Sequence, residues 1–314
     1  MSHSSRTKVV VDTDIGTDPD DGLALAYLAM HPACDLLGVT IVTGDVQQRA
    51  AVAEILLRAC GRSDVPIHCG RREPLLKGAG QPLVQQYDCI KHMTHIQGRP
   101  ENAAVDFLQR TIRNHPGEVV LLTIGPLSNA GLLFALDPEL PSLCKEVVSM
   151  CGKYFGPEKH QKEWNILVDE TAAGIVLKTQ RPRHRFVGLD VTRPCTLQAH
   201  DAEKRLFQEL GELGGLMKSL GDWWLKKKDR FTFHDPLAAA IIFQPDLCEW
   251  VTGRMDVDPS NGATSFEANA GTDLVACDVN PEAFFTNYFE VVKSTSPKET
   301  FDRMRAQVSS QVSS

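Results

Sequence analysis

Paired cysteines are the first feature that the sequence lacks. Its nine cysteines never form a C-x-x-C pair, and their number is odd. Scattered single cysteines of this kind indicate neither a disulfide framework nor a zinc ribbon. We therefore expect reduced thiols, most of them buried.

Long runs of one character are also missing. No segment approaches the roughly 20 consecutive apolar residues of a membrane span, and the opening MSHSSRTK has no apolar signal region. The net charge of -7 is spread along the chain without a long basic run. This argues against nucleic acid or an anionic membrane as the main partner. The sequence favours a small-molecule ligand and a cytoplasmic location.

What the sequence does contain is an alternation of apolar strands and helices. Hydrophobic residues make up 42% of the chain, enough for a large buried core. Apolar strands without an inside-outside alternation are typical of a parallel sheet covered on both faces. The predicted strands are Val9–Val11, Leu36–Val42, Val65–Cys69, Val119–Thr123, Val147–Met150 and Phe186–Leu189. The predicted helices between them are Leu23–Met30, Ala50–Cys60, Ala103–Arg113, Asn129–Leu136 and Thr171–Lys178. We therefore predict an α/β fold with a doubly wound, mostly parallel sheet flanked by helices.

The remaining segments are less regular. Residues 71–98 are predicted to form a long irregular loop, which in a compact domain is more often functional or mobile than neutral. A helical region is predicted over residues 202–228, with a second helix starting near Pro236. Weaker strands are predicted near Trp250–Asp256 and Leu274–Val279.

The domain organisation follows from what interrupts this pattern. The length of 314 residues fits one large α/β domain or two smaller ones. Because we find no internal repeat and no convincing linker, we predict one domain over residues 1–306. The polar ending QVSSQVSS predicts a disordered tail over residues 307–314.

An acidic cluster follows the first predicted strand. Two like charges about 4 Å apart repel by ~4 kcal/mol at an effective dielectric of ~20. The dipole at a helix N-terminus stabilises each carboxylate by only ~0.3–1 kcal/mol. Either several of these acids face water as turn and cap residues, or a bound cation holds them together. Oxygen ligands without nearby Cys or His favour Ca²⁺ or Mg²⁺ over zinc. The cluster is Asp12, Asp14, Asp18, Asp20 and Asp21.

The five aspartates of this cluster differ in how well a purely structural role explains them. Asp18 is best explained as a turn or cap residue. For Asp12, a hydrogen-bonded role at the strand end and a functional role are equally good explanations. The other three aspartates are the stronger candidates for chemistry.

Two further segments could take part in a site at the same edge of the sheet. Residues 233–237, FHDPL, place His234 beside Asp235, although an Asp before a Pro is also an N-cap signature. Residues 162–169, KEWNILVD, place Glu163 and Asn165 around an aromatic residue. Each segment alone has a purely structural explanation.

Together these motifs resemble those of the nucleoside hydrolase family, the inosine-uridine-preferring N-ribohydrolases. The family's opening signature, a strand followed by D-x-D-x-G-x-D-D, is matched by residues 12–21, with Asp18-Pro19 inserted before the final pair. The likeness runs from about Val9 to about Asn280. The further matches, in the family's order and spacing, are Val42–Asp45, Thr123–Asn129, Met150–Gly152, Glu163–Asn165 and His234–Pro236.

The resemblance implies a Ca²⁺ ion as cofactor. Its ligands would be the side chains of Asp14, Asp21 and Asp235 and a backbone carbonyl that falls on Ile124. Such ions take about 6–8 oxygen ligands, so ribose hydroxyls and one water would complete the set. Family members usually assemble, which implies a homodimer or homotetramer.

The resemblance also implies the reaction, which is hydrolysis of a ribonucleoside to free base and ribose. Asp14 would be the general base, and His234 would be the acid on the leaving-group side, where a pKa in the neutral range suits proton donation. Breaking an N-glycosidic bond passes through an oxocarbenium-like sugar, so the site must hold a water below the anomeric carbon and negative charge near the cation. The implied substrate-binding residues are Asp20, Asp45, Glu163, Asn165 and Asp235.

Three departures from the family pattern limit what can be carried over. Because Pro fixes one φ angle, we expect the inserted Asp18-Pro19 to bulge outward and leave the final pair in place. Asp45 stands where the family usually has Asn, which adds negative charge to the site. Residues 154–162 lack a clear match to the Asn that reaches the 5′ end of the ribose. The preferences for the base and for the 5′ substituent therefore stay open.

Two other interpretations remain. Phosphatases of the haloacid dehalogenase type also place D-x-D after an apolar strand, so Asp12 could be a nucleophile and Asp14 an acid–base with Mg²⁺. That interpretation leaves the motifs at residues 163–165 and 234–236 unexplained. A non-catalytic member of the nucleoside hydrolase fold that binds Ca²⁺ or a nucleoside is the second alternative.

Overall fold

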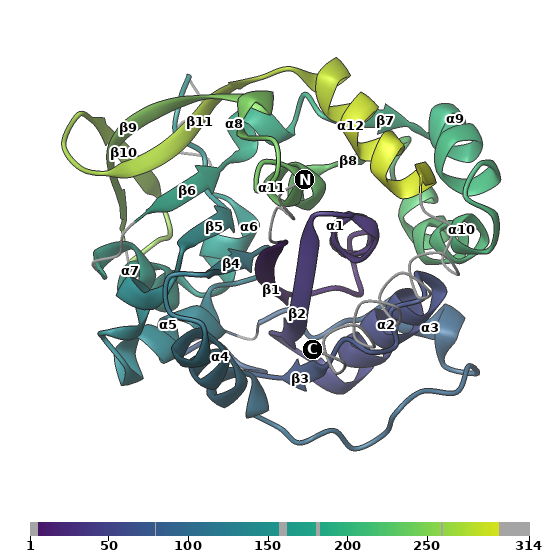
Figure 1. Ribbon diagram of the computed structural model, residues 1–314, viewed down its shortest axis with the longest axis horizontal. Helices are drawn as coiled ribbons and strands as arrows, with labels where there is room; N and C mark the ends of the chain where they lie inside the picture. Colours follow the sequence, from purple (N-terminus) through teal and green to yellow (C-terminus); the bar gives the residue numbers. More distant parts are fainter. Residues whose placement is uncertain (1–5, 79, 157–161, 180–182, 259, 295–314) are drawn as a thin grey trace, which may run out of the picture.

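A nine-stranded sheet in the order β10-β9-β11-β6-β5-β4-β1-β2-β3 runs through the molecule (Figure 1). The computed structural model describes residues 6–78, 80–156, 162–179, 183–258 and 260–294. The strands are β1 (Thr7–Thr13), β2 (Cys34–Ile41), β3 (Ile67–Cys69), β4 (Val119–Thr123), β5 (Glu146–Met150), β6 (His184–Val187), β9 (Cys248–Val257), β10 (Thr264–Ala268) and β11 (Asp273–Val279). Two short strands, β7 (Thr196–Gln198) and β8 (Arg230–Thr232), form a separate antiparallel pair.

The strand order creates a switch point at the centre of the sheet. From β1 the chain winds through β2 to β3 on one side, and then returns to wind from β4 through β5 to β6 on the other side. Strands β1 and β4 are therefore parallel neighbours whose following loops diverge, with Asp12 opposite Thr123 at their carboxyl ends. In open α/β sheets, ligands bind outside the carboxyl ends of the strands at such a point.

Apolar side chains on both faces hold this sheet in the core. In β1, Val9 and Val11 pack into the hydrophobic core on one face of the sheet, whereas Val10 packs into a second core on the other face. All three valines are fully buried. A strand that buries both faces has no reason to alternate polar and apolar residues, which explains the continuous apolar run VVV.

Helices cover both faces of the sheet, and α12, drawn in yellow in Figure 1, packs against α1 and α11. The α-helices are α1 (Asp20–Met30), α2 (Val46–Ala59), α3 (Tyr87–Ile90), α4 (Ala103–Asn114), α5 (Ser128–Leu136), α6 (Trp164–Val168), α7 (Glu170–Lys178), α8 (Leu189–Thr192), α9 (Ala199–Ala202), α10 (Gly211–Leu225), α11 (His234–Ala240) and α12 (Pro281–Ser294). Short 3₁₀ helices span Leu140–Leu143 and Pro245–Leu247, and a π-helix spans Glu203–Gln208.

The predicted fold class is confirmed, but several elements were predicted wrongly or missed. The helical region over residues 202–228 is not continuous, because a π-helix and a left-handed Gly211 separate α9 from α10. The strand predicted to reach Leu189 ends at Val187, and Leu189 begins α8. The predicted irregular loop contains the one-turn helix α3. Helices α6 and α12 and strands β7, β8 and β10 were not predicted. The predicted tail at residues 307–314 lies outside the described residues.

The cysteines are as expected. All nine lie in the described residues and none forms a disulfide; seven of them are buried, whereas Cys89 and Cys277 are half-buried. Among the helices that the structure describes, none is both long and apolar enough to cross a membrane.

Candidate active site

A cavity of about 390 Å³ opens beyond the carboxyl ends of β1, β4 and β5. This is the switch-point edge of the sheet, where a ligand is expected in this fold. Acidic side chains line one part of the cavity, and aromatic and apolar side chains line another. The lining residues are Asp14, Thr17, Asp18, Asp20, Asp21, Gln81, Ile124, Met150, Lys162, Glu163, Trp164, Asn165, Leu189, Trp224, His234 and Asp235.

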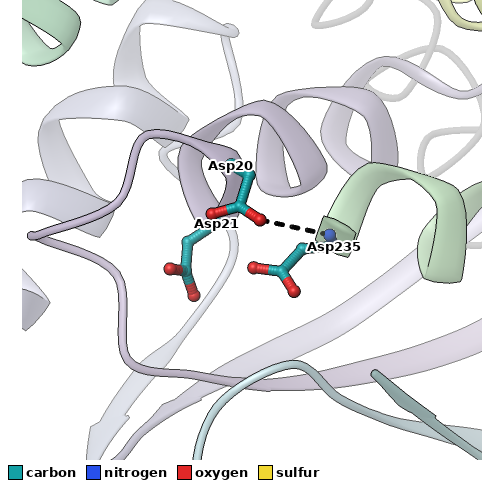
Figure 2. A group of neighbouring side chains, drawn as sticks. All are labelled: Asp20, Asp21 and Asp235. Atoms are coloured by element: carbon teal, nitrogen blue, oxygen red, sulfur yellow. Dashed lines mark hydrogen bonds between the residues drawn. The ribbon is translucent and has the colours of Figure 1, made fainter. Parts of the chain in front are cut away.

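Three buried aspartates form the centre of the acidic part. Asp20 and Asp21 stand on the first turn of α1, and Asp235 stands on the first turn of α11 (Figure 2). Each offers a carboxylate oxygen, and these oxygens all lie within 4.8 Å of one another. The backbone N–H of Asp235 donates to Oδ2 of Asp20 at 3.4 Å. Two segments more than 200 residues apart in sequence thus meet around one small volume.

Burial makes this arrangement electrostatically unfavourable without a cation. It raises the pKa of Asp20, Asp21 and Asp235 well above the usual value of 3.8, and the neighbouring carboxylates raise it further. Buried charges are stable only when they are paired or coordinate a metal. The acidic triad of Asp20, Asp21 and Asp235 could therefore hold a metal ion, and its oxygen-only donors suit a hard cation.

Asp14 lies in the same cavity but outside this triad. Burial raises its pKa to about 6, which the positive charge of Arg49 partly opposes. Its charge also raises the pKa of Asp21, so the two carboxylates are close neighbours. The structure thus gathers Asp20, rather than Asp14, most tightly with Asp21 and Asp235.

Ile124, the predicted carbonyl ligand, lines the cavity directly after β4. Its carbonyl accepts a hydrogen bond of 2.9 Å from Nδ2 of Asn165. A carbonyl oxygen has two lone pairs, so this bond fixes its position and leaves capacity for a second partner.

Asp12 has the hydrogen-bonded role at the strand end. Its Oδ1 accepts from Oγ1 of Thr40 at 2.5 Å and from Nδ2 of Asn129 at 2.7 Å. It is fully buried and is not among the cavity-lining residues, and burial raises its pKa to about 7. Asp12 therefore connects β1 with β2 and α5 beneath the site.

We expected the inserted Asp18-Pro19 pair to bulge away from the site, but the structure shows that it does not. Asp18 lines the cavity and is hydrogen-bonded to Asp20, and burial raises its pKa to about 7. Pro19, not Asp18, occupies the N-cap position of α1, and no side chain caps that helix. The insertion nevertheless leaves Asp20 and Asp21 on the first helical turn, because Pro tolerates the αR conformation that starts the helix.

Glu163 and Asn165 reach the cavity from the start of α6. Glu163 is the N-cap of this helix, with Oε1 accepting from the backbone N–H of Asn165 at 2.8 Å. Burial raises its pKa to about 7, although three backbone donors oppose that shift. Asn165 donates to the carbonyls of Ile124 and Met150 at 2.9 and 3.1 Å. These bonds hold the ends of β4 and β5 around the cavity.

His234 begins α11 and faces the cavity beside Asp235. Its Nδ1 lies 2.7 Å from the hydroxyl of Thr192. The expected neutral-range pKa is wrong, because burial, with a smaller effect of Arg193, lowers the pKa to about 4. The ring is therefore neutral near pH 7. If Thr192 donates to Nδ1, the ring proton is on Nε2, which makes that atom a hydrogen-bond donor.

Asp45 is placed differently from the other predicted residues. Its carboxylate caps α2 by accepting from the backbone N–H groups of Gln47 and Gln48 at 3.2 and 3.1 Å. It is not among the residues that line the cavity. In this structure the Asp45 side chain therefore stabilises the N-terminus of α2.

Sequence reasoning missed the aromatic part of the cavity. Trp164, which is 52% exposed, donates through Nε1 to Oε1 of Gln81 at 3.0 Å. Trp224 reaches the cavity from α10, and its Nε1 donates to the carbonyl of Arg230 at 3.0 Å. Trp164 stood inside the Glu163–Asn165 motif and could have been found, whereas nothing near Trp224 or Gln81 marked them.

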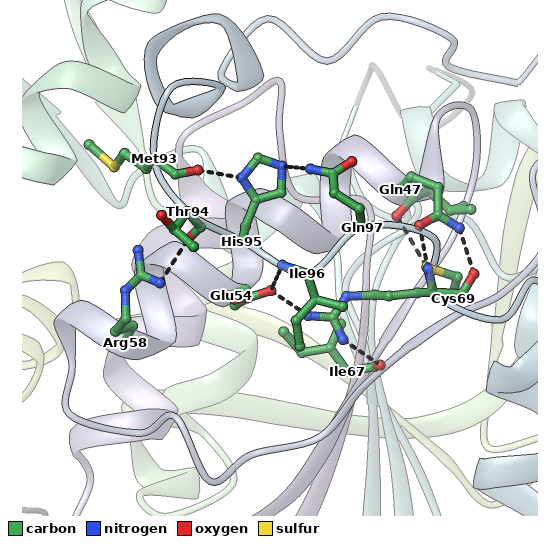
Figure 3. Close-up of polar contacts among 12 residues, drawn as sticks. Gln47, Glu54, Arg58, Ile67, Cys69, Met93, Thr94, His95, Ile96 and Gln97 are labelled. Atoms are coloured by element: carbon green, nitrogen blue, oxygen red, sulfur yellow. Dashed lines mark hydrogen bonds and ion pairs between the residues drawn. The ribbon is translucent and has the colours of Figure 1, made fainter.

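Another part of the irregular loop is fastened to α2 away from the cavity. His95 is hydrogen-bonded to the carbonyl of Met93 at 2.7 Å and to Nε2 of Gln97 at 2.6 Å (Figure 3). Glu54 of α2 accepts from the backbone N–H of Ile96 at 3.0 Å. None of these residues lines the active-site cavity. Their hydrogen bonds instead hold this part of the loop against α2.

Fold and site together define a class, a doubly wound α/β enzyme with a carboxylate-lined ligand cavity at its switch point. A family model described as inosine-uridine preferring nucleoside hydrolase matches residues 9–286. The chain therefore belongs to the nucleoside hydrolase family, whose members hydrolyse the N-glycosidic bond of ribonucleosides.

Individual relatives agree with this assignment. The chain is 30% identical over 272 residues to uridine nucleosidase 1 of Arabidopsis thaliana, covering 80% of this chain and 78% of that protein. It is 28% identical over 275 residues to the pyrimidine-specific ribonucleoside hydrolase RihB of Escherichia coli, covering 82% and 85%. A purine-preferring ribonucleoside hydrolase from Gardnerella vaginalis has the same fold, with a TM-score of 0.77, 24% identity, and coverage of 91% and 98%.

Proposed function

We propose that this enzyme hydrolyses ribonucleosides to free base and ribose with Ca²⁺ as its cofactor. The observation that carries the proposal is the meeting of Asp20 and Asp21 with Asp235 inside a buried cavity. Three acids from the starts of two helices cannot all be ionised there without a counter-cation. The family assignment does not favour the alternatives of a phosphatase and a non-catalytic binder.

The ion would be held by Asp14, Asp21 and Asp235, with the carbonyl of Ile124 as a backbone ligand. Ca²⁺ tolerates flexible sets of 6–8 oxygens, so the carboxylate of Asp20 beside this group can also turn toward the ion or toward the substrate. When bound, the ion would lower the pKa of a water and fix the orientation of the ribose hydroxyls.

The ribose would be recognised by acids and amides that surround the ion. Asp20, Glu163 and Asn165 line the cavity, and carboxylate oxygens are acceptors for sugar hydroxyls. Asp235 would contact both ion and ribose. Asp45 is retained as a proposed contributor to substrate binding, although it would have to act from its helix-capping position.

Asp14 would be the general base. Burial raises its pKa to about 6, which places it near neutral pH, where a general base is most effective. Below the sugar it would accept a proton from the attacking water. Its negative charge, with that of its neighbours, would also stabilise the cationic sugar of the transition state.

On the leaving-group side, His234 would act as a neutral hydrogen-bond donor. A ring with a pKa of about 4 carries only its single N–H proton near pH 7, so its contribution would be a hydrogen bond to the departing base as negative charge develops there. Trp224 lines the same cavity and could contact the base by stacking.

Replacing His234 by Ala is expected to lower kcat unequally among substrates. Bases that leave as poorly stabilised anions depend most on a donor, so their kcat should fall by about 10²-fold or more. For substrates whose base can be protonated by another group, kcat should fall far less. Steady-state ribose release from inosine and uridine would measure the difference, with His200→Ala as a control at a histidine whose side chain is 80% exposed. Equal losses on every substrate would argue against this role.

Metal affinity and metal-free stability are expected to change with pH in opposite directions. The pKa of Asp14 is raised to about 6 from 3.8, so the folded metal-free protein holds a proton that the unfolded chain has lost. Metal-free stability should therefore fall as the pH rises from about 4 to about 6. Ca²⁺ displaces protons from its ligands, so its affinity should rise by about tenfold per pH unit for each proton displaced.

Calorimetric Ca²⁺ titration and thermal melts between about pH 4 and pH 8 would test this pair of slopes. A Ca²⁺ affinity that does not change with pH would show that the ion's ligands are already ionised in the free protein.

Location and assembly stay predictions from the sequence. We propose a cytoplasmic enzyme that forms a homodimer or homotetramer and binds neither nucleic acid nor membranes. The relatives are named for different bases, pyrimidine in one and purine in another, so the base preference is left to experiment.

A reducing-sugar assay on inosine, adenosine, guanosine, uridine and cytidine tests the proposed function. We expect free ribose from at least one of them. Release of phosphate from an aryl phosphate without any ribose would instead indicate phosphatase chemistry. Calorimetric binding of a nucleoside with neither product would indicate a non-catalytic binder.

A further inference from the structure

Arg49 is a fully buried arginine on α2, directly behind the acidic part of the cavity. It lies outside the sequence motifs described above, and it does not line the cavity. Arg is rarely buried unless its donors are satisfied. Arg49 satisfies its donors with backbone carbonyls from three separate segments of the chain.

The first segment is the loop that carries the acids. Nη1 of Arg49 donates to the carbonyl of Asp14 and to that of Ile15, the latter at 3.1 Å. The guanidinium also interacts electrostatically with the carboxylates of Asp14 and Asp21. It is thus a fixed positive charge on the side of the acidic loop away from the cavity.

The second and third segments are the end of β2 and the wall of the cavity. Nε of Arg49 donates to the carbonyl of Thr43 at 2.8 Å, and Nη2 donates to the carbonyl of Gln81 at 2.8 Å. The planar fork of a guanidinium can reach several acceptors at fixed angles, which a lysine ammonium cannot. One side chain therefore joins the acidic loop to the segment that carries Gln81.

Three atoms of Gln81 form hydrogen bonds with neighbouring residues. Its carbonyl accepts from Arg49, its N–H donates to Oγ1 of Thr43 at 3.0 Å, and its Oε1 accepts from Trp164. Gly44, in the left-handed region at φ 64°, lets the backbones approach, because a Cβ there would overlap the carbonyl oxygen of Gln81. Thr43 holds the same left-handed conformation at φ 63°, which is unfavourable for a β-branched residue.

The orientation of the Gln81 amide follows from its partner. An indole N–H can only donate, so Oε1 of Gln81 must face Trp164. The other end of the amide, the Nε2 donor, is then the end available to a ligand. Both Gln81 and Trp164 line the cavity.

We propose that Arg49 is a positioning residue that sets the distance between the acidic loop and the Gln81–Trp164 wall, so that a substrate on the acids also meets the Gln81 amide. The effect on substrate rests on the proposed function. We expect Gln81 to contact the substrate away from the reacting bond, so this role concerns binding more than chemistry.

The test compares Arg49→Lys with Arg62→Lys. Arg62 is also buried, at 2% exposure, but it pairs with Asp64 and does not line the active-site cavity. For Arg49→Lys we expect KM to rise by about 10-fold or more, within the range that small misplacements cost, while kcat falls much less. For Arg62→Lys we expect a lower melting temperature without a change in KM.

A double-mutant cycle separates positioning from general packing. If Arg49 acts through Gln81, then Arg49→Lys should change KM by no more than about twofold in a Gln81→Ala background. Full additivity would overturn the proposal. Should Arg49→Lys fail to fold, Thr43→Val removes the hydroxyl that holds the N–H of Gln81, and it should show the same non-additivity with a smaller change in KM.

A third readout needs no substrate. The quenching of Trp164 fluorescence by acrylamide is measured for each protein. The contribution of the other tryptophans is removed by subtracting the signal of the same protein with Trp164→Phe added. Arg49→Lys should bring this quenching to the value seen in Gln81→Ala, and Arg62→Lys should leave it unchanged. If the wild type releases no ribose, the proposed function fails, yet this arm still decides whether Arg49 positions Gln81. Unchanged quenching in Arg49→Lys would overturn the proposal.

Discussion

Replacing Asp14 by Asn is expected to lower kcat by about 10²–10⁴-fold, the usual contribution of a general base. Asn has the same shape but cannot accept a proton from the attacking water. The fold should persist. Without metal, the variant should melt no lower than the wild type, because one of several buried, mutually repelling carboxylates is removed. Steady-state ribose release and a thermal melt measure the two effects.

Asp12→Asn is the matched control for this prediction. Asp12 lies two residues earlier and is buried without lining the cavity. An amide oxygen can still accept from Thr40 and Asn129, whereas the new buried NH₂ costs about 1–3 kcal/mol if it finds no partner. We expect a lower melting temperature and a kcat within about tenfold of wild type. Full activity in Asp14→Asn with none in Asp12→Asn would reverse the assigned roles.

Removing the divalent ion is expected to have the second large effect. A metal contributes several kcal/mol of transition-state stabilisation, so a calcium chelator should lower turnover by about 10³-fold. The chelated protein should also melt at a lower temperature, because an ion at about 100 times its Kd stabilises the folded state by about 2.7 kcal/mol. Ribose release and melts, before and after chelation, measure both.

Restoring the ion shows which metal the site prefers. Ca²⁺ should restore turnover more fully than Mg²⁺, because Mg²⁺ demands near-ideal octahedral geometry and gives up its water reluctantly. A protein that keeps its turnover after thorough dialysis against chelator would contradict a metal-dependent reaction.

The parts of the fold that the sequence predicted are those set by local pattern. Strand β4 was predicted at its observed bounds, because the apolar run ends at the glycine and proline of Ile124-Gly125-Pro126. Helix α12 was missed even though Phe284 and Tyr288 have helical spacing and pack into the core. The break between α9 and α10 depends on a π-helix, which no local pattern announces.

The site was predictable where the resemblance supplied partners. The resemblance implied Asp14, Asp21 and Asp235 as the metal-binding side chains and Asp20 as a ribose-binding residue. The structure gathers Asp20, Asp21 and Asp235 most tightly, with Asp14 lining the same cavity. The neutral pKa assumed for His234 could not be checked from the sequence, because the shift comes from burial by segments remote in the chain. Burial and distant contacts also hid Arg49, whose partners lie on three different segments.

The departures from the family pattern show the same limit. The sequence showed that Asp18-Pro19 was inserted but not that Asp18 would turn into the cavity beside Asp20. It also marked Asp45 as unusual, yet the capping of α2 by that carboxylate competes with a role in binding ribose. Asp and Asn are both good N-caps, so the local sequence could not distinguish the two roles.

The most direct test of the account is a crystal structure of the enzyme grown with Ca²⁺ and ribose. We predict one ion among Asp14, Asp21, Asp235 and the carbonyl of Ile124, with Ca–O distances of about 2.3–2.6 Å and two ribose hydroxyls in its coordination sphere. Ribose bound in the cavity with no ion between it and these carboxylates would contradict the account.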